Sequence, residues 1–406
     1  MNFIEFEEET DHRVSEALLS DDTARAITDL PGAPIALEPP SFLNDRNYVL
    51  RSNGCVGVIP IGNDLTLRIS PKVPVLNVFR MLEYAYDLRS FLILEGTNRS
   101  ASLKDLFETL ALILARKVLD RVRKGLHRDY VEDTDSLVVP RGRILLAESI
   151  VGRLRGRVRL DCVFDDHTPD LDDNRILAWT LHQIRRCNLE RPDVKRAVRD
   201  AYRAMSAVVD IRPVVSKACI GRLYDRLNSD YRPMHGLCRF FLSHCGPAIG
   251  GGEHEFLPFR VDMPALFEAF VERWLRRSLP PSLHLDSQFQ AIVDERNRYR
   301  FVVDLVISEA SSGKALAVLD TKYKRDRKLA SGDLEQIVAY AARMGTAHAF
   351  LIYPSPKTES EEFGWSTSLR VHTTTFDIGA DLEIAGRRFL RGLLTAVTPG
   401  AVTLPT

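Results

Sequence analysis

The stretch YRFVVDLVISEASSGKALAVLDTKYK, residues 299–324, decides the fold class because it predicts two buried strands that carry charged groups. Its first half is an apolar strand with one carboxylate, Asp304. After a short turn, the second half carries Asp320 and Lys322, which are two residues apart and therefore project to one face of a strand. Carboxylates inside an apolar sheet are costly unless a cation pairs with them. Lys322 and a metal ion would together supply that positive charge.

Helices are predicted on both sides of this stretch. Residues 264–277 form an amphipathic pattern in which Asp262 is placed to cap the helix and Glu268 lies on the flank of the apolar face. A later helix carries Gln336 and Tyr340 four residues apart, so both lie on one side of it. The order is helix with Glu, strand with Asp, strand with Asp-x-Lys, and helix with Gln-x-x-x-Tyr.

The chain divides into three predicted segments. Residues 1–110 are β-rich and helical, residues 111–250 are mainly helical, and residues 251–406 alternate helix and strand around a mixed central sheet. The glycine-rich run at 246–252 is the predicted linker. The fold class is therefore α/β in the last segment and α+β overall, with a β-rich and helical region before it.

The first two segments carry weaker local patterns. Residues 56–71 predict a β-hairpin, and residues 31–40, which are rich in proline, predict an irregular connection. The pattern turns helical over residues 76–123. Arginine alternates with other residues over 153–159, which predicts a strand with one arginine face, and residues 172–174 predict the start of a helix.

Composition excludes several classes of protein. The chain has 406 residues, 45% of them hydrophobic, and its 55 Lys and Arg balance its 55 Asp and Glu, so it is not a uniformly basic nucleic-acid binder. No apolar stretch is long enough for a transmembrane helix, and the acidic N-terminus is unlike a signal peptide. Six scattered cysteines without CxxC pairs favour a reduced, cytoplasmic protein with no membrane contact.

Phosphodiester hydrolysis explains why these residue types occur together. Such a reaction needs a metal ion to stabilise charge on phosphoryl oxygens and to activate water. Mg²⁺ prefers oxygen ligands, which Asp304 and Asp320 could supply, and Glu268 could add a ligand or hold a metal-bound water. Lys322 could orient the water and stabilise developing charge. Gln336 and Tyr340 are poor Mg²⁺ ligands, so positioning roles are assigned to them.

Each motif taken alone has a simpler structural interpretation. A single Asp in a strand is usually a turn or salt-bridge residue, and an Asp-Thr-Lys tripeptide is common by chance. Tyr340 could be ordinary helix packing, with Gln336 exposed to solvent. The four motifs in this order are far more specific than any one of them.

A basic run and a group of His and Cys residues are two further clusters that could have a function. A basic run after the second strand could contact DNA phosphates or could be a solvated loop, and the two interpretations are about equally supported. A zinc site in the segment 235–245 is not favoured, because the spacing of its His and Cys residues fits no familiar zinc pattern. The basic run comprises Lys324, Arg325, Arg327 and Lys328.

The motif order resembles the restriction-endonuclease-like superfamily with the PD-(D/E)xK motif, and the Gln-x-x-x-Tyr helix looks like its RecB-type branch. The likeness extends to the McrC family, the nuclease subunits of McrBC modification-dependent restriction systems. The segments that carry it are LRISPKVP (67–74), MLEYAY (81–86), RGRILL (141–146), LDDNRILAWTL (171–181), YDRLNSDYRPMHGLC (224–238), DMPALFEAFVERWL (262–275) and VLDTKYK (318–324).

The resemblance implies a restriction partnership. It implies a Mg²⁺-dependent endonuclease, with Mn²⁺ as a possible substitute, that cuts double-stranded DNA. It also implies that the N-terminal half docks on a hexameric, GTP-hydrolysing AAA+ partner of the McrB type and stimulates its GTPase. The chain has no GxxxxGK[ST] motif, and therefore no P-loop of its own.

Two other functions stay open at this point. The protein could be a GTPase-stimulating adaptor whose nuclease site is weak or inactive, but an inactive site usually loses at least one member of the set Asp304, Asp320 and Lys322. It could instead be a RecB-like repair exonuclease, against which the McrC-like N-terminal half weighs.

Overall fold

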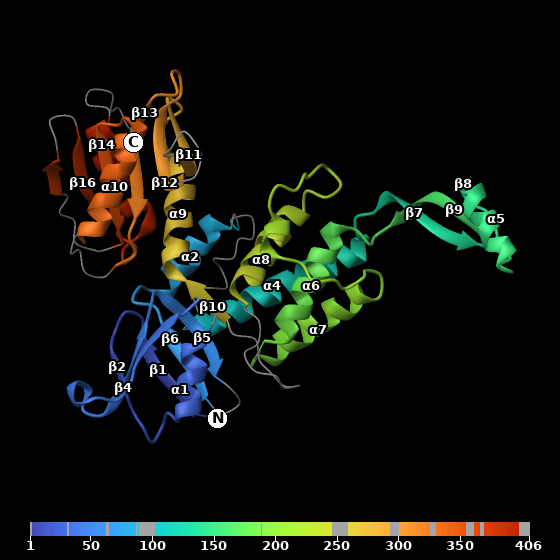
Figure 1. The fold of residues 1–406 in the computed structure, drawn as a ribbon, viewed down its shortest axis with the longest axis horizontal. Coiled ribbons are helices and arrows are strands. Elements are labelled where there is room, and N and C mark those ends of the chain that lie inside the picture. The colour runs from blue at the N-terminus through green and yellow to red at the C-terminus, as the bar shows by residue number, and fades with distance from the viewer. Residues whose placement is uncertain are drawn as a thin grey trace. The chain divides into compact units, whose positions relative to one another are not determined.

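The computed structural model describes residues 2–30, 32–61, 65–86, 88, 102–187, 189–245, 259–292, 300–324, 330–354, 361–365 and 369–397 (Figure 1). Contacts between residues divide the chain into two compact units. Unit 1 combines Met1–Leu106 with Pro247–Thr406, and unit 2 is Phe107–Gly246. The first and third predicted segments thus share one unit. Their independence as separate domains stays a prediction, and the predicted linker lies outside the described residues.

A six-stranded mixed sheet forms the second half of unit 1, in the order β11-β12-β13-β14-β16-β15. Strands β13, β14 and β16 run parallel to one another, whereas the pairs β11–β12, β12–β13 and β15–β16 are antiparallel. The predicted mixed sheet is confirmed. The strands are β11 (Leu283–Ile292), β12 (Arg300–Glu309), β13 (Ala315–Thr321), β14 (His348–Tyr353), β15 (Glu361–Gly364) and β16 (Arg370–Thr375).

Three helices accompany this sheet: α9 (Met263–Ser278), α10 (Ser331–Met344) and α11 (Leu382–Val397). The predicted cap of α9 is confirmed, since the Asp262 carboxylate accepts a hydrogen bond of 2.9 Å from the backbone N–H of Ala265. Helix α10 packs on β13 and β14 through an apolar face. Its buried residues Ile337, Tyr340 and Ala341 share one hydrophobic cluster with Val318 and Leu351 of those strands.

The first half of unit 1 contains two smaller sheets. One has the order β1-β6-β5-β10 and the other the order β2-β4-β3. The predicted hairpin is confirmed as the antiparallel pair β5–β6, and its turn lies outside the described residues. The irregular connection predicted for residues 31–40 is wrong in part, because β3 lies within it and pairs with β4. The strands are β1 (Asn2–Glu7), β2 (His12–Ser15), β3 (Ile35–Glu38), β4 (Asn47–Ser52), β5 (Cys55–Ile61), β6 (Leu65–Ser70) and β10 (Phe259–Asp262), and the helices are α1 (Asp21–Thr28), η1 (Phe42–Asn44) and α2 (Val75–Ala85).

Two contacts join the halves of unit 1. Strand β10, which directly precedes α9, completes the N-terminal sheet by pairing antiparallel with β5. Helix α2 packs on α9, and the amide of Asn77 on α2 donates to the carbonyls of Ile378 and Ala380 at 2.7 and 2.9 Å. The N-terminal half and the six-stranded sheet of unit 1 are therefore connected through these segments.

Unit 2 consists of helices and one projecting arm. The helices are α4 (Leu103–Lys124), in which the division between the units falls, α6 (Asp172–Arg185), α7 (Pro192–Ser206), η3 (Ser216–Cys219) and α8 (Tyr231–His244). The helix start predicted at residues 172–174 is confirmed as the first turn of α6. The arm comprises residues 129–168 and extends from these helices (Figure 1). It contains the sheet β7-β9-β8 and helix α5, with β7 (Asp129–Leu137), β8 (Arg143–Ile144), α5 (Leu146–Leu154) and β9 (Leu160–Thr168).

The strand predicted for residues 153–159 is wrong. Helix α5 continues to Leu154, and Gly156 then adopts a left-handed backbone with φ +79°, which ends the helix before β9 begins at Leu160. A left-handed glycine after a helix is a common way to terminate it. Four alternating arginines matched the two-residue period of a strand, but the run is too short to distinguish a strand from a helix end followed by a turn.

None of the helices in the described part of the chain is both long enough and apolar enough to cross a membrane.

Candidate active site

Two carboxylates face each other on adjacent strands of the six-stranded sheet. The antiparallel register pairs Leu305 of β12 with Leu319 of β13, so the next residues along, Asp304 and Asp320, lie opposite one another. The two carboxyl groups are close enough for each to affect the pKa of the other. The side chain of Asp320 is 3% exposed, and the backbone N–H of Thr321 donates to Asp304 Oδ2 at 3.2 Å. The sheet thus brings together the two acids that the sequence predicted as metal ligands.

The pKa values of both acids are raised, which indicates that too little positive charge lies near the pair. Burial, followed by the charge of Asp304, raises the pKa of Asp320 to about 7. Burial also raises the pKa of Asp304. Glu268 on α9 belongs to the same electrostatic environment, because burial and then the charge of Asp304 raise its pKa. A group of acids that resists ionisation in this way would be stabilised by a bound cation.

Lys322 supplies the cation that the structure shows. Its Nζ lies 2.8 Å from Asp320 Oδ2 and 3.5 Å from Asp333 Oδ1. Burial lowers the pKa of Lys322, but the hydrogen bond and charge of Asp320, together with the charge of Asp333, outweigh it, so the net pKa is raised. Lys322 is therefore charged at neutral pH. Asp333 also pairs with Lys324, so the Lys322 ammonium serves mainly the Asp304–Asp320 pair, and one ammonium leaves these two carboxylates short of positive charge.

Gln336 and Tyr340 extend this cluster along α10. Lys322 Nζ donates to Gln336 Oε1 at 3.3 Å, and Gln336 Nε2 donates to the Tyr340 hydroxyl oxygen at 2.7 Å. Tyr340 is buried in the hydrophobic cluster between α10 and the sheet. As the structural alternative expected, Tyr340 packs against the sheet and Gln336 is exposed, but the Gln336 amide also joins the Tyr340 hydroxyl to Lys322.

The basic run is described only at its first member. Lys324 Nζ pairs with Asp333 Oδ2 at 2.5 Å. Arg325, Arg327 and Lys328 lie outside the described residues. Contact of this run with DNA stays a prediction.

Gln288 was not identified from the sequence. Successive strand residues normally point to opposite faces, yet Ser287 and Gln288 of β11 both reach α9, since Gln288 has a left-handed backbone with φ +51°. Ser287 Oγ donates to Glu272 Oε1 at 3.0 Å, and the Gln288 amide donates to Glu268. Gln288 therefore orients the third acid of the site. Glutamine carries no sequence signal for a left-handed backbone, so only the structure shows this contact.

The family of the chain is shown by its sequence. Residues 50–354 match the family model described as "McrBC 5-methylcytosine restriction system component". The chain belongs to this McrBC family. It is similar to the "Type IV methyl-directed restriction enzyme EcoKMcrBC" of Escherichia coli (strain K12), with 24% identity over 330 residues, which are 76% of this chain and 92% of that relative.

A solved structure has a similar fold. It is described as a "Refined half-complex from tetradecameric assembly of Thermococcus gammatolerans McrB AAA+ hexamers with bound McrC". The TM-score is 0.58 at 21% identity, and the match covers 98% of this chain and 100% of the chain in that structure. The mixed fold with four sheets is thus one that a McrBC complex also contains.

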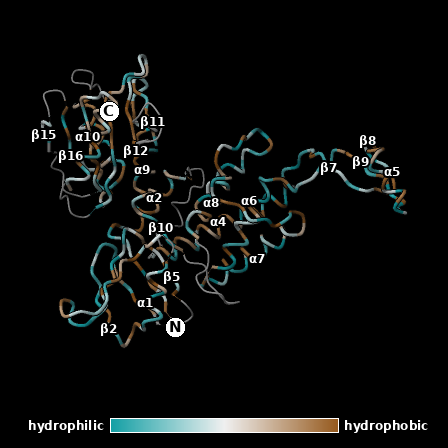
Figure 2. The backbone as a smooth tube through the Cα atoms, in the orientation of Figure 1, coloured by the Kyte–Doolittle hydropathy of each residue, from teal (hydrophilic) through white to brown (hydrophobic). Residues whose placement is uncertain are grey.

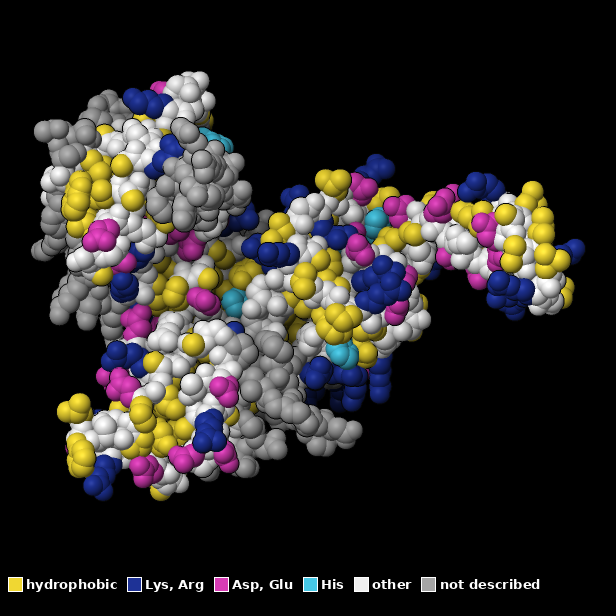
Figure 3. Space-filling model, in the orientation of Figure 1, with side chains coloured by type: hydrophobic (Ala, Val, Ile, Leu, Met, Phe, Trp, Pro, Cys, Tyr) yellow, Lys and Arg dark blue, Asp and Glu magenta, His cyan; other side chains and the backbone are white. Residues whose placement is uncertain are grey.

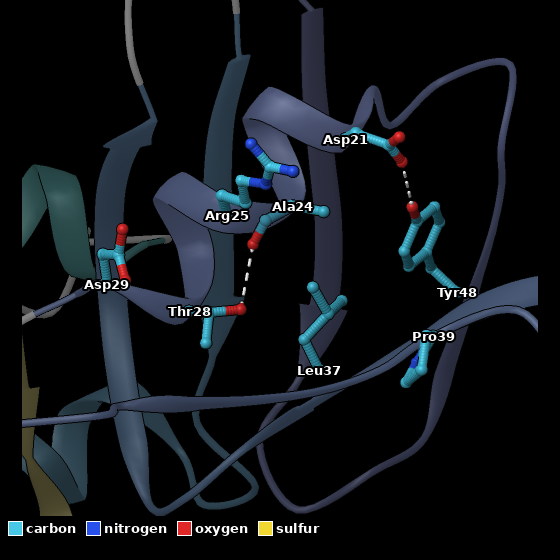
Figure 4. Close-up of a pocket in the computed structure, with 8 residues that line it drawn as sticks. All are labelled: Asp21, Ala24, Arg25, Thr28, Asp29, Leu37, Pro39 and Tyr48. Atoms are coloured by element: carbon cyan, nitrogen blue, oxygen red, sulfur yellow. Dashed lines mark hydrogen bonds between the residues drawn. The ribbon is translucent and has the colours of Figure 1, made fainter.

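Two other places in this McrBC-family chain carry no catalytic cluster. Figure 4 shows a cavity of about 450 Å³ beside α1, where the Tyr48 hydroxyl donates to Asp21 at 3.0 Å. The zinc alternative gains no support, since His235 is bonded to the Tyr224 hydroxyl and the Asp173 carbonyl. Across the described ranges, no three His, Cys, Asp or Glu side chains form a group that could hold a metal ion. The other residues that line the cavity are Ala24, Arg25, Thr28, Asp29, Leu37 and Pro39.

The residues present fit Mg²⁺ more closely than a metal that needs a full protein cage. Mg²⁺ is usually held by one or two carboxylates, with water and phosphate oxygens completing its shell. The buried Asp304–Asp320 pair offers that arrangement, with Glu268 alongside.

We expect the metal-free protein to be more stable at about pH 5 than at about pH 8. The pKa of Asp320 rises from 3.8 to about 7 on folding, so its contribution to stability is full below pH 3.8 and is lost as the pH rises through about 7. Thermal melting in a chelator at both pH values checks this, with Asp320→Asn as the control. An equal pH effect in parent and variant would contradict the assignment to Asp320.

Proposed function

We propose that the chain is the Mg²⁺-dependent DNA endonuclease subunit of a McrBC-like restriction system. The observation that carries this proposal is the cluster of Asp304, Asp320 and Lys322 at one place on two adjacent strands. Membership of the McrBC family supports the restriction setting. The activity proposed is hydrolysis of phosphodiester bonds in double-stranded DNA.

The residues of the cluster have separable roles in this proposal. Asp304 and Asp320 would hold Mg²⁺, for which Mn²⁺ can substitute, and Glu268 alongside them would hold a metal-bound water. When bound, the metal ion offsets charge on the phosphoryl oxygens and lowers the pKa of a water molecule. The Lys322 ammonium orients the attacking water and stabilises charge that develops on the phosphate. Gln336 holds Lys322, and Tyr340 holds Gln336.

Docking on a GTP-hydrolysing, McrB-like AAA+ hexamer is the second part of the proposal. The arm supports it, because its far end exposes large hydrophobic side chains (Figure 3), and hydrophobic residues lie along α5 there (Figure 2). Exposed apolar patches of this kind usually mark an interaction site. We assign the docking surface to unit 2, and the setting to the cytoplasm, where the six free cysteines would stay reduced. The exposed side chains are Val138, Val139, Leu146, Ile150, Leu154 and Val158, with relative exposures of 71, 77, 70, 59, 84 and 83%.

Cleavage of circular DNA tests the proposal. The protein would be purified with the AAA+ protein encoded beside it and incubated with methylated and unmethylated closed circles, Mg²⁺ and GTP. We expect linear product that depends on GTP and on both proteins. An adaptor without nuclease activity would stimulate GTP hydrolysis and leave the DNA intact, and a RecB-like exonuclease would degrade only DNA that has free ends.

We expect Gln336→Ala to slow cleavage by about tenfold, the scale of a lost supporting contact. The variant loses the amide that joins Lys322 to Tyr340, while the carboxylates that would bind Mg²⁺ are unchanged. Cleavage rates, melting temperature and Mg²⁺ affinity would be measured together, with Glu335→Ala on the same helix as the control. Parental cleavage by Gln336→Ala would remove Gln336 from the site.

A further inference from the structure

The residue after Lys322 is anchored in the N-terminal part of unit 1. Tyr323 is 7% exposed, and its hydroxyl donates a hydrogen bond of 2.8 Å to Glu8 Oε1. Glu8 directly follows β1 and is fully buried. Since burying a carboxylate is costly, this contact needs support from other groups.

Lys72 provides that support. Its backbone N–H donates to the same Glu8 oxygen at 3.0 Å, and its Nζ lies 3.9 Å from the centroid of the Tyr323 ring. The Lys72 ammonium also pairs with Glu9 at 2.7 Å. Lys72 belongs to the segment LRISPKVP, so the contact joins two of the motifs that mark the family. An ammonium over an aromatic face is a favourable contact, most of all where both groups are shielded from water.

The Tyr323 ring also lies beside the helix that carries Glu268. Its centroid is 6.0 Å from that of Phe267, the residue before Glu268. Gly54 of the N-terminal part lies close to both elements. A Cβ built at this glycine would be 2.8 Å from Pro264 Cδ at the start of α9 and 3.9 Å from Tyr323 Cδ1. Tyr323 is therefore enclosed by the N-terminal sheet on one side and by α9 on the other.

The backbone explains why an anchor is needed at this position. Strand β13 ends at Thr321, and the N–H of Lys322 still bonds to the carbonyl of Ile352 on β14, at 2.8 Å. The chain then turns, with the N–H of Lys324 donating to the carbonyl of Lys322 at 3.0 Å. Lys322 thus sits where the sheet pairing stops, and Tyr323 holds the chain just beyond it.

We propose that Tyr323, held by Glu8 and Lys72, is a positioning residue that fixes the direction of the Lys322 ammonium toward the Asp304–Asp320 pair. This inference rests on the proposed nuclease function for its catalytic consequence. Its geometric part concerns only the residues of this chain, and can therefore be tested without cleavage.

Two variants test it on the full chain with its AAA+ partner. Tyr323→Phe removes the hydroxyl and keeps the ring, and Glu8→Gln keeps the shape of the side chain but replaces the carboxylate by a neutral amide, which is a weaker acceptor. For Tyr323→Phe we expect kcat for DNA cleavage to fall by about tenfold, with KM and Mg²⁺ affinity within about twofold of the parent. Tyr84→Phe is the matched control, because it removes another tyrosine–glutamate bond within unit 1, that to Glu383.

A second readout is independent of activity. Acetic anhydride would be applied to the metal-free proteins, and acetylation of Lys322 followed by mass spectrometry relative to exposed Lys314. We expect Lys322 to react several-fold faster in Tyr323→Phe and Glu8→Gln than in the parent or Tyr84→Phe. The reason is that a Lys322 side chain displaced from Asp320 is more accessible to the reagent.

The outcomes separate the inference from the proposed function. An active parent with unchanged kcat and unchanged Lys322 acetylation in both variants would overturn the inference, and Tyr323 would then be core packing. A parent that does not cut DNA, combined with faster acetylation in the variants, would reject the nuclease function and keep the positioning role. Should Tyr323→Phe fail to fold, Glu8→Gln decides by the same two measurements.

Discussion

Asp320→Ala is expected to lose DNA cleavage completely while it still stimulates the GTPase of the AAA+ partner. The variant removes the acid that is most buried in the candidate site and that holds Lys322 at 2.8 Å. Both the proposed metal site and the orientation of Lys322 depend on this carboxylate. The docking surface proposed for GTPase stimulation belongs to unit 2, whereas Asp320 belongs to unit 1, so the two activities separate.

A control variant and the stability of Asp320→Ala show whether the loss of cleavage comes from the candidate site. Asp286→Ala removes a partly exposed carboxylate from β11 of the same sheet, and we expect it to cut DNA like the parent. Asp320→Ala also removes an acid whose ionisation is opposed by burial and by Asp304, so at about pH 8 the metal-free variant should melt no lower than the parent. Loss of both cleavage and GTPase stimulation in a well-folded variant would mean that one site serves both activities.

Local sequence patterns predicted the elements that carry the candidate site. The strands around Asp304 and Asp320 are apolar and lie close together in the chain, so an antiparallel pair that places both acids on one face follows from strand periodicity. Gln336 contacts Tyr340 on α10 because residues four apart share a helix face. Such contacts depend on short-range spacing, which a sequence displays directly.

Contacts between distant segments could not be predicted in the same way. Glu8 and Tyr323 are separated by 315 positions, and neither residue type signals the other. Gln288 reaches Glu268 only because its backbone is left-handed, a conformation that no pattern assigns to glutamine. The strand predicted at residues 153–159 was wrong for a different reason, since a few alternating residues fit a strand and a helix end equally well. The sequence therefore predicted the acids, the lysine and the nearby Gln336, but not Gln288 and Glu8, which reach the site from distant segments.

Asn174→Ala is expected to destabilise unit 2 by about 3–5 kcal/mol, the range for breaking a buried hydrogen-bond network. Asn174 lies in the motif LDDNRILAWTL and is fully buried. Its amide donates to the carbonyls of His127 and Pro169, at 2.9 and 2.6 Å, and its Oδ1 accepts from the Tyr231 hydroxyl at 2.6 Å. His127 and Pro169 lie just outside the two ends of the arm, so one side chain closes its base and ties it to α8.

The alanine variant leaves two carbonyls and a hydroxyl buried without this partner, which is why the cost exceeds that of a single hydrogen bond. Hydrogen exchange of peptides from α6 and α8 measures the loss within unit 2 and is not confused by unfolding of unit 1. The control is Asp172→Ala in the same helical turn, because Asp172 is 71% exposed and should cost no more than about 1 kcal/mol. Equal protection of α6 and α8 in the two variants would show that Asn174 does not hold the base of the arm.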